Sequence, residues 1–526
     1  MDGTRVQVLQ DIENWIRNPE APQIFWLAGM AGTGKTAIAQ TVCSRVHEHA
    51  EVMLGGSFFC SRSTGSAAQR KVRCIVPTLA RLLARKSIKF GEALAAELTN
   101  DPEIPNHRVS EQVKRLLYKP LIAVKDSHVP IVFVIDALDE CGGKPTAGEA
   151  PNTDSDRMVS ELLTALVDLS RSSVKLPVKF LVTSRPETHI RDTPVSDITF
   201  STILHLHTVG TEQVTSDIRL YISTRLFSSP KLRARFTADD ADLLARLSDG
   251  LFIVATTALK YALGEGIDAA ASRFKTLLNS ARDGLSSGAA VPLDSMYSLI
   301  LMDTARVGQV HADELNALLQ LLASLLSAQM ALSVAALADI LDQDKDEVRA
   351  RLSRLHAVVY VPDDDDEPSL RVLHASFGDY LFHRAPSAIS ISQSLGHVIM
   401  ARGCLHFMAK YLHFNVSQSQ SSYHTNPATK PGTITLPLEY ACLQWIYHVS
   451  GLPSVSSLEE DIHNIFRAKF LFWLEVMSVL GQVRRAIAML VFAAGMVRGN
   501  VCAINRSSSN ARIGSIGSTS TIPPGC

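Results

Sequence analysis

The chain has little net charge and no long run of one sign. Its 526 residues carry a formal net charge of −1. No extended Lys/Arg segment interrupts this balance, so no strong overall field favours nucleic acid or an anionic membrane surface as a partner. We therefore expect the protein to bind no nucleic acid.

Cysteines are few and scattered. None of the eight forms a Cys-x-x-Cys pair, which argues against both a disulfide scaffold and a zinc site. Reduced thiols in a cytoplasmic protein are the simplest interpretation. The cysteines are Cys43, Cys60, Cys74, Cys141, Cys404, Cys442, Cys502 and Cys526.

Long apolar segments are also missing. The start of the chain, "MDGTRVQVLQDIENW", contains acids and no apolar stretch of the kind found in a signal peptide. The apolar stretch 486–497 has 12 residues between Arg485 and Arg498. This length is too short to cross a bilayer and predicts a buried helix, so we expect no membrane span.

Apolar strands and helical stretches alternate over residues 21–210. The runs "IFWLA" (24–28), "IVFVIDALDE" (131–140) and "STILHLHTV" (201–209) read as strands, together with "GGSFFC" and "VKFLVTSRPE". This alternation predicts a three-layer α/β domain with a mostly parallel sheet.

The length of the chain favours several domains over one. Helices dominate after residue 211, and "VVYVPDDDDEPSLRVLHASF" reads as a hairpin followed by a helix, which suggests a winged-helix module. We predict an N-terminal helix over 1–20, a nucleotide-binding domain over 21–210, a helical domain over 211–285, a winged-helix-like domain over 290–386, a helical region over 388–503 and a disordered tail over 504–526.

"GMAGTGKT" (29–36) matches the phosphate-binding pattern G-x-x-x-x-G-K-[ST] between a predicted strand and a predicted helix. Glycines let successive backbone N–H groups surround phosphates at the positive end of the helix. Lys35 is expected on the β- and γ-phosphates, and the Thr36 hydroxyl on Mg²⁺. The predicted phosphate-binding residues are Gly29, Ala31, Gly32, Thr33, Gly34, Lys35 and Thr36.

Two further strands end in polar residues. Asp136 closes the apolar strand "IVFVID" and is the expected second magnesium ligand. Glu140 or Asp139, directly after it, could position an attacking water, although acids after a strand often only cap a turn. In "FLVTSRPE", Arg185 could sense the γ-phosphate, because a guanidinium can donate two parallel hydrogen bonds to phosphate oxygens.

Other nucleotide enzymes fit this sequence poorly. A GTPase would be expected to show N/T-K-x-D and D-x-x-G motifs, whereas Asp136 is followed by Ala137, Leu138 and Asp139. A small-molecule kinase leaves the long helical region after the site unexplained. We therefore expect ATP or ADP, with Mg²⁺, as the ligands.

The ordered set "IFWLAGMAGTGKTAIA", "VFVIDALDEC" and "KFLVTSRPE" resembles the NACHT family of STAND nucleotide-binding proteins, specifically its large fungal branch. "SDGLFIVATTALKYA", "LRVLHASFGDYLFHR" and "LEYACLQWIYHVS" resemble later helical and winged-helix segments of that family. The resemblance covers roughly residues 4–500.

This resemblance implies an ADP-closed, ATP-open switch with weak ATPase activity that self-associates into oligomers. It also implies roles in fungal non-self recognition or programmed cell death, with effector and sensor proteins as partners. His374 of "LHASF" becomes the candidate winged-helix contact to phosphates, although a merely structural histidine is an equal possibility. Phe252 follows Gly250 where related switches contact adenine through Gly-x-Pro; without the Pro, we expect a core role for Phe252.

Two other functions stay open at this point. The protein could be an ATPase with continuous turnover, or a helical scaffold whose nucleotide is purely structural. The chain starts near the nucleotide-binding domain and ends without sensor repeats. We therefore expect a truncated member of the family, or partners that supply effector and sensor functions in trans.

Overall fold

The structure is a computed structural model that describes residues 3–48, 51–61, 69, 71–127, 129–141, 153–199, 201–264, 267–286, 292–306, 312–419 and 432–494. The chain forms two compact units: Met1–Ala335 with Lys345–Gln393, and Ala336–Asp344 with Ser394–Cys526. The predicted tail over 504–526 lies outside the described residues.

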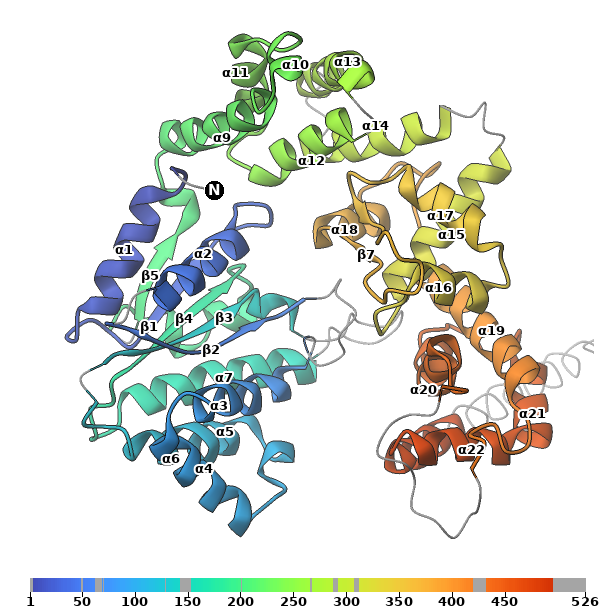
Figure 1. Ribbon diagram of the computed structural model, residues 1–526, viewed down its shortest axis with the longest axis horizontal. Helices are drawn as coiled ribbons and strands as arrows, with labels where there is room; N and C mark the ends of the chain where they lie inside the picture. The colour runs from blue at the N-terminus through green and yellow to red at the C-terminus, as the bar shows by residue number, and fades with distance from the viewer. Residues whose placement is uncertain are drawn as a thin grey trace, which may run out of the picture. The chain divides into compact units, whose positions relative to one another are not determined.

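A five-stranded sheet of order β2-β3-β4-β1-β5 forms the centre of the first unit (Figure 1). All of its neighbouring strands run parallel, which confirms the predicted parallel sheet. The strands expected over 131–140 and 201–209 are shorter than predicted, because each ends in a 3-10 turn. The strands are β1 (Ile24–Ala28), β2 (Met53–Phe59), β3 (Ile131–Asp136), β4 (Val178–Ser184) and β5 (Ser201–His205).

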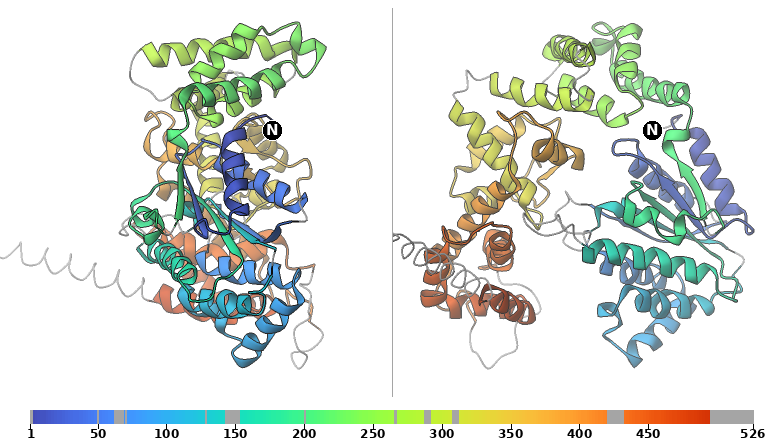
Figure 2. Two further views of the ribbon diagram at one scale, coloured as in Figure 1. Left: turned by 90° about the vertical axis from the view of Figure 1, so that its left-hand side faces the viewer. Right: turned by 180° about the vertical axis from the view of Figure 1, so that it is seen from behind.

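Helices cover both faces of this sheet. Successive residues of β1 point to opposite faces: Trp26 packs into one apolar cluster, Phe25 and Leu27 into the other. Burial on both faces explains why β1, β3 and β4 are nearly continuous apolar runs. One face carries α1 (Val6–Arg17) and α2 (Lys35–Glu48); the other carries α3 (Ile75–Ala84), α4 (Ile88–Asn100), α5 (Val109–Gln112), η4 (Val113–Tyr118), α6 (Lys119–Ile122) and α7 (Thr153–Ser170) (Figures 1 and 2).

Helices follow the sheet, as predicted, and a small antiparallel hairpin lies among the later ones. The short helical turns of the sheet region are η2 (Val72–Cys74), η3 (Ile104–Asn106), η5 (Leu138–Glu140), α8 (Thr188–Arg191), η6 (Pro194–Ser196) and η7 (Leu206–Thr208). The later elements are α9 (Thr211–Leu226), α10 (Pro230–Arg233), α11 (Ala238–Leu247), α12 (Phe252–Leu263), α13 (Ile267–Ser286), α14 (Pro292–Arg306), α15 (Ala312–Ser327), α16 (Val334–Leu341), α17 (Lys345–Ser353), β6 (Val359–Tyr360), β7 (Arg371–Val372) and α18 (Ala375–His383).

The second unit is helical in its described part. Its core includes the fully buried Tyr440, Cys442 and His448 of α20. His448 Nε2 lies 2.9 Å from the Tyr440 hydroxyl, and burial holds the pKa of His448 well below its usual range. Besides most of α16, its elements include α19 (Gln393–Tyr411), α20 (Leu436–Ser450), α21 (Glu459–Ala468) and α22 (Phe470–Val479).

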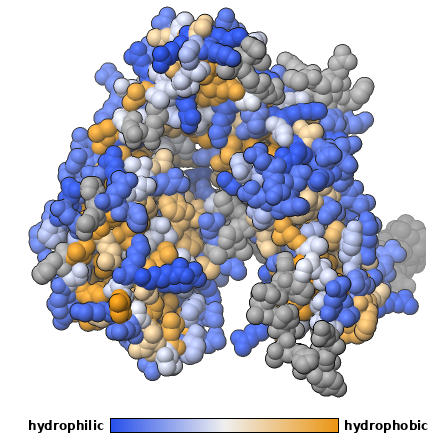
Figure 3. Space-filling view, in the orientation of Figure 1, coloured by the Kyte–Doolittle hydropathy of each residue, from blue (hydrophilic) through white to orange (hydrophobic). Residues whose placement is uncertain are grey.

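Hydrophilic residues predominate on the face shown in Figure 3, with apolar side chains scattered among them. None of the helices in the described ranges combines the length and the apolar character needed to cross a membrane.

Candidate nucleotide-binding site

The predicted phosphate loop joins β1 to α2 in the first unit. Gly32 and Gly34 have φ angles of 79° and 94°, in the left-handed region that glycine adopts without steric cost. Gly32 also faces α12: a Cβ there would lie 2.2 Å from Ile253 Cγ2. The Ile253 amide donates to the Gly32 carbonyl at 3.2 Å. The loop therefore needs glycine at this position for its own shape and for the approach of α12.

Lys35 is the first residue of α2 and lines the cavity beside the loop. Its ammonium donates to the carbonyls of Gly29 at 2.7 Å and Met30 at 3.0 Å. Burial lowers the pKa of Lys35, while the nearby Asp139 acts in the opposite direction. A partly desolvated cation here attracts an anion more strongly than an exposed one would.

Asp136 lies at the carboxyl end of β3 and is buried. It accepts a hydrogen bond from Thr183 Oγ1 at 2.6 Å and another from the Thr36 hydroxyl. Burial raises the pKa of Asp136, and these hydroxyl donors act against that rise. Thr36 and Asp136 thus bring together the oxygen donors that Mg²⁺ prefers, so the residues fit the predicted metal. Among the described residues no cluster of three or more His, Cys, Asp or Glu side chains could hold a metal by itself.

Asp139 and Glu140 differ in their surroundings. The backbone turns sharply at Ala137, whose φ is 52°, and its amide donates to Thr183 Oγ1 at 3.0 Å. Asp139 is buried and accepts from the Arg185 amide at 2.9 Å. Glu140 is half-buried on the cavity wall. Of the two acids, Glu140 has the geometry to contact a ligand, whereas Asp139 fixes the position of Arg185.

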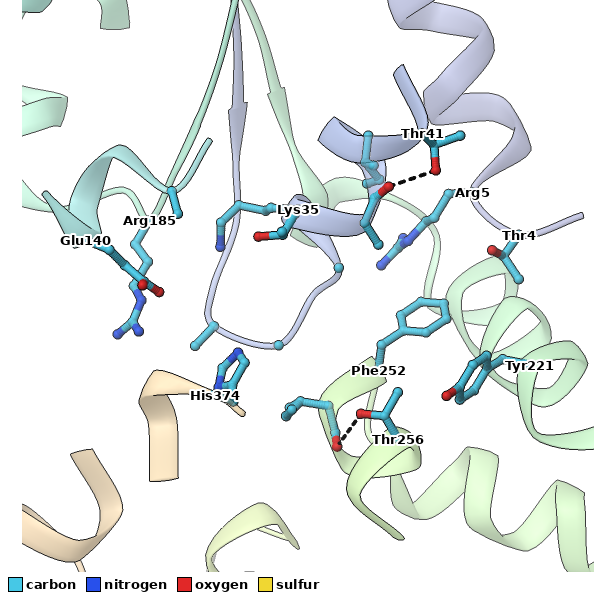
Figure 4. A pocket seen from close by; sticks show the side chains of 18 of the residues that line it. Thr4, Arg5, Lys35, Thr41, Glu140, Arg185, Tyr221, Phe252, Thr256 and His374 are labelled. Carbon is cyan, nitrogen blue, oxygen red and sulfur yellow. Dashed lines mark hydrogen bonds between the residues drawn. The ribbon is translucent and has the colours of Figure 1, made fainter. Parts of the chain in front are cut away.

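Arg185 follows β4 and lies between two carboxylates. Its Nε is 3.2 Å from Asp139 Oδ2, and its Nη1 is 3.6 Å from Asp379 Oδ2 of α18. Its side chain also lines the cavity, close to Glu140 (Figure 4). Arg185 therefore connects the sheet to α18 at the edge of the cavity.

His374 caps the N-terminus of α18 and lines the same cavity. The Ser376 amide donates to His374 Nδ1 at 3.1 Å, so in the neutral ring the proton belongs on Nε2. Burial, reinforced by the positive charges of Arg185 and Lys35, lowers the pKa of His374 to about 4. At neutral pH His374 is therefore an uncharged donor.

Sequence reasoning missed Arg5, the residue just before α1. Its side chain is 6% exposed and lines the cavity. Its Nη2 donates to the Thr33 carbonyl at 3.0 Å, and its amide donates to Asp217 Oδ2 at 3.0 Å. Its Nε and Nη1 are buried without a partner in the described structure. No local pattern marks this residue, because its burial depends on distant α9 and α12.

Phe252 corrects an expectation. We expected it in the core, but it is half-buried and forms a wall of the cavity with Tyr221 (Figure 4). The Arg5 guanidinium carbon lies 5.2 Å from the centroid of its ring, within the range of a cation–π contact. The position was identified from the sequence; its role was not.

One cavity of about 460 Å³ joins these residues, a size typical of small-ligand sites. Acidic and basic side chains line one end, and Arg5, Tyr221 and Phe252 line the other (Figure 4). Asp136 lies behind Thr36. Within the loop, the Gly29 carbonyl accepts a hydrogen bond from Lys35, and the Thr33 hydroxyl donates one to the Met30 carbonyl. The predicted residues on the cavity wall are Ala31, Gly32, Gly34, Lys35, Thr36, Asp139, Glu140, Arg185 and His374.

The chain resembles one protein family and one curated relative in sequence. Residues 3–185 match the family described as "Nephrocystin 3, N-terminal". The vegetative incompatibility protein HET-E-1 of Podospora anserina is 22% identical over 521 residues, which cover 92% of this chain and 36% of that protein. The chain thus spans little more than a third of the length of this relative.

Two solved structures are more distant. The STAND protein PH0952 from Pyrococcus horikoshii, which has a tetratricopeptide repeat sensor, is 10% identical; the match covers 90% of this chain and 57% of that chain, with a TM-score of 0.40. Cdc6p from Pyrobaculum aerophilum is 14% identical, with 77% of this chain and 94% of that chain covered and a TM-score of 0.31. These scores are too low for either structure to support an assignment.

Proposed function

We propose that this chain, a P-loop NTPase of the NACHT type within the STAND group, is a nucleotide-controlled switch. ADP would hold it closed, and exchange for ATP would open it for self-association. The observation that carries this proposal is one cavity that is lined by the N-terminal segment, the phosphate loop, the ends of β3 and β4, α9, α12 and His374. A ligand in contact with all of these segments would stabilise their closed arrangement by its differential affinity.

The phosphate end of the cavity carries the predicted chemistry. Lys35 and the loop amides would bind the β- and γ-phosphates. Thr36 and Asp136 would hold Mg²⁺, which supplies charge neutralisation on the phosphates. Arg185 would sense the γ-phosphate from its place between Asp139 and Asp379.

Hydrolysis would be slow. Glu140 is the residue we assign to positioning water, because Asp139 is already engaged by Arg185. Because Arg185 is held between two carboxylates, its guanidinium is less free to move toward the negative charge that develops on the transferred phosphate. Weak ATPase activity suits a switch, because the ATP-bound conformation must persist and rapid hydrolysis would end it.

The opposite end of the cavity would bind the base. Phe252 and Tyr221 offer aromatic surface there, and the unpartnered Nε and Nη1 of Arg5 offer donors. Burying these N–H groups without partners costs free energy, which acceptors on a nucleotide base or ribose would recover. ATP remains the expected nucleotide.

Arg5→Ala should weaken ATP binding by about tenfold or more, because a buried charge-assisted hydrogen bond contributes roughly 1.5–3 kcal/mol. Calorimetry with ATP and with inorganic tripolyphosphate measures this. Tripolyphosphate affinity should stay nearly unchanged, since it lacks the base and ribose. Arg17→Ala, at the exposed end of α1, is the control. Equal losses for both ligands would show that Arg5 only supports the phosphate loop.

His374 would sense the closed state. In this proposal the hairpin, α15, α17 and α18 belong to a winged-helix module, and the neutral His374 donates from Nε2 to the ADP phosphates. The capping bonds from Ser376 orient the ring toward the phosphate loop (Figure 4). Opening would then require this contact to break.

The biological setting is part of the proposal. The fungal relative is named for vegetative incompatibility, and a similar role in non-self recognition or programmed cell death would place this chain in the cytoplasm. Its partners would be further copies of itself and unidentified effector and sensor proteins.

The proposal is tested by the mass of the protein in solution. Light scattering would compare ADP, ATP and a non-hydrolysable analogue for wild type, Lys35→Ala and Glu140→Gln, with turnover measured in parallel. We expect oligomers with ATP or the analogue, none for Lys35→Ala, and stable oligomers with slowed hydrolysis for Glu140→Gln. The exposed Lys89→Ala and Glu111→Gln are matched controls.

The other two functions give different outcomes. A monomer under every condition that hydrolyses ATP rapidly would identify a continuously working ATPase. A monomer that retains ADP, with no response to Glu140→Gln, would identify a scaffold with a structural nucleotide. Either result would contradict the switch.

A further inference from the structure

Cys60 and Cys141 lie side by side beneath the acidic edge of the site. Their Sγ atoms are 2.7 Å apart, and each residue is 4% exposed. Both are free thiols in this structure. Among the described residues, no other two cysteine sulfurs are within hydrogen-bonding distance of each other.

The sheet determines this proximity. β2 and β3 are parallel neighbours in which Phe59 pairs with Asp136, and the Cys60 amide donates to the Asp136 carbonyl at 2.9 Å. The turn after Asp136 then brings the chain back, with the Cys141 amide bonded to the Leu138 carbonyl at 3.1 Å. The two thiols are therefore held together by backbone hydrogen bonds on both sides.

We propose that Cys60 and Cys141 form a reversible disulfide that fastens the turn carrying Glu140 to the end of β2. A disulfide has an S–S length of about 2.05 Å, so the sulfur atoms need to approach by only about 0.7 Å. Cys141 directly follows Glu140 in sequence. The bond would thus anchor the turn one residue from the carboxylate that we assign to positioning water.

The oxidant in this reaction is a peroxide. One thiolate attacks a peroxide oxygen, which gives a sulfenic acid and releases hydroxide. The second thiol attacks that sulfur, forms the S–S bond and releases water. With hydrogen peroxide, two thiols lose two electrons and two protons in total, and the peroxide is reduced to two waters. A thiol reductant reverses the reaction by exchange.

The reaction should be slow but selective. Burial raises the pKa of Cys60, so little thiolate is present at neutral pH. Cys74 is a third thiol of the same region and is more exposed, which makes it the natural competitor for either partner.

The test is oxidation of the whole chain with hydrogen peroxide, followed by acid quench, alkylation under denaturing conditions and peptide mass mapping. We expect one intramolecular Cys60–Cys141 link that dithiothreitol reverses. Because the bond closes a loop of about 80 residues, the melting temperature without nucleotide should rise by about 5 °C or more. Hydrogen exchange at residues 137–141 should slow in the oxidised form.

The variants separate this site from general oxidation. Cys60→Ser and Cys141→Ser should lose the link and the rise in melting temperature, whereas Cys74→Ser should keep both. Three outcomes would each overturn the proposal. The first is that Cys60 and Cys141 both remain alkylatable after full oxidation, and the second is a disulfide from either of them to Cys74. The third is unchanged hydrogen exchange at residues 137–141. None of these measurements requires nucleotide, so they stand apart from the test of the switch.

Discussion

Lys35→Ala should lose at least 100-fold in ATP affinity. The ammonium is partly desolvated at the cavity wall, where its attraction to phosphate oxygens is stronger than in water. A factor of 100 corresponds to about 2.7 kcal/mol of binding free energy, a plausible loss for charge-assisted bonds to more than one phosphate. Calorimetry at fixed ionic strength, with ATP and ADP, measures the change.

The unliganded variant supplies the control for folding. Lys35 donates to the Gly29 and Met30 carbonyls, so its removal also changes the loop. Because those bonds are offset by the cost of burying the ammonium, the melting temperature without nucleotide should change little. Affinity within threefold of wild type would contradict the assigned role of Lys35.

Gly32→Ala should also abolish tight nucleotide binding, and it should destabilise the first unit. A left-handed φ costs a non-glycine residue about 1–2 kcal/mol. The new Cβ would lie 2.2 Å from Ile253 Cγ2, so α12 would have to shift away from the loop. We expect a loss of at least 30-fold in ATP affinity and a fall of several degrees in melting temperature, measured by calorimetry and thermal unfolding.

Gly34→Ala separates strain from steric conflict. Gly34 has the same left-handed conformation, but the nearest atom to its added Cβ, Phe252 Cδ2, is 3.9 Å away. Gly34→Ala should therefore show the cost of strain alone. Adding Ile253→Ala to Gly32→Ala should recover part of the lost stability. Equal losses of stability for Gly32→Ala and Gly34→Ala, with no recovery on adding Ile253→Ala, would show that the contact between Gly32 and α12 contributes nothing to stability.

The sheet was predictable because its signal is local. β1, β3 and β4 are buried on both faces and therefore appear as uninterrupted apolar runs. The polar residues at their carboxyl ends had to meet at one edge of a parallel sheet. That geometry explains why Lys35, Glu140 and Arg185 could be grouped from the sequence, and the structure brings all of them to one cavity.

Two assignments could not be made from the sequence. Asp139 and Glu140 are adjacent acids with equal chemistry that both line the cavity. Only the folded turn after β3 buries Asp139 against Arg185 and leaves Glu140 half-buried. Arg5 and Phe252 are separated by most of the nucleotide-binding region and become neighbours only when α12 docks on the phosphate loop.

The strands of the parallel sheet, the phosphate loop and the candidate ligands of Mg²⁺ could thus be predicted from the sequence alone, because apolar runs, glycine spacing and strand-end acids are local properties. The tertiary structure decided which acid is buried against Arg185, what lies at the end of the cavity beside Phe252 and which thiols meet. Those features depend on side chains brought together over long distances by packing, and no local pattern records them.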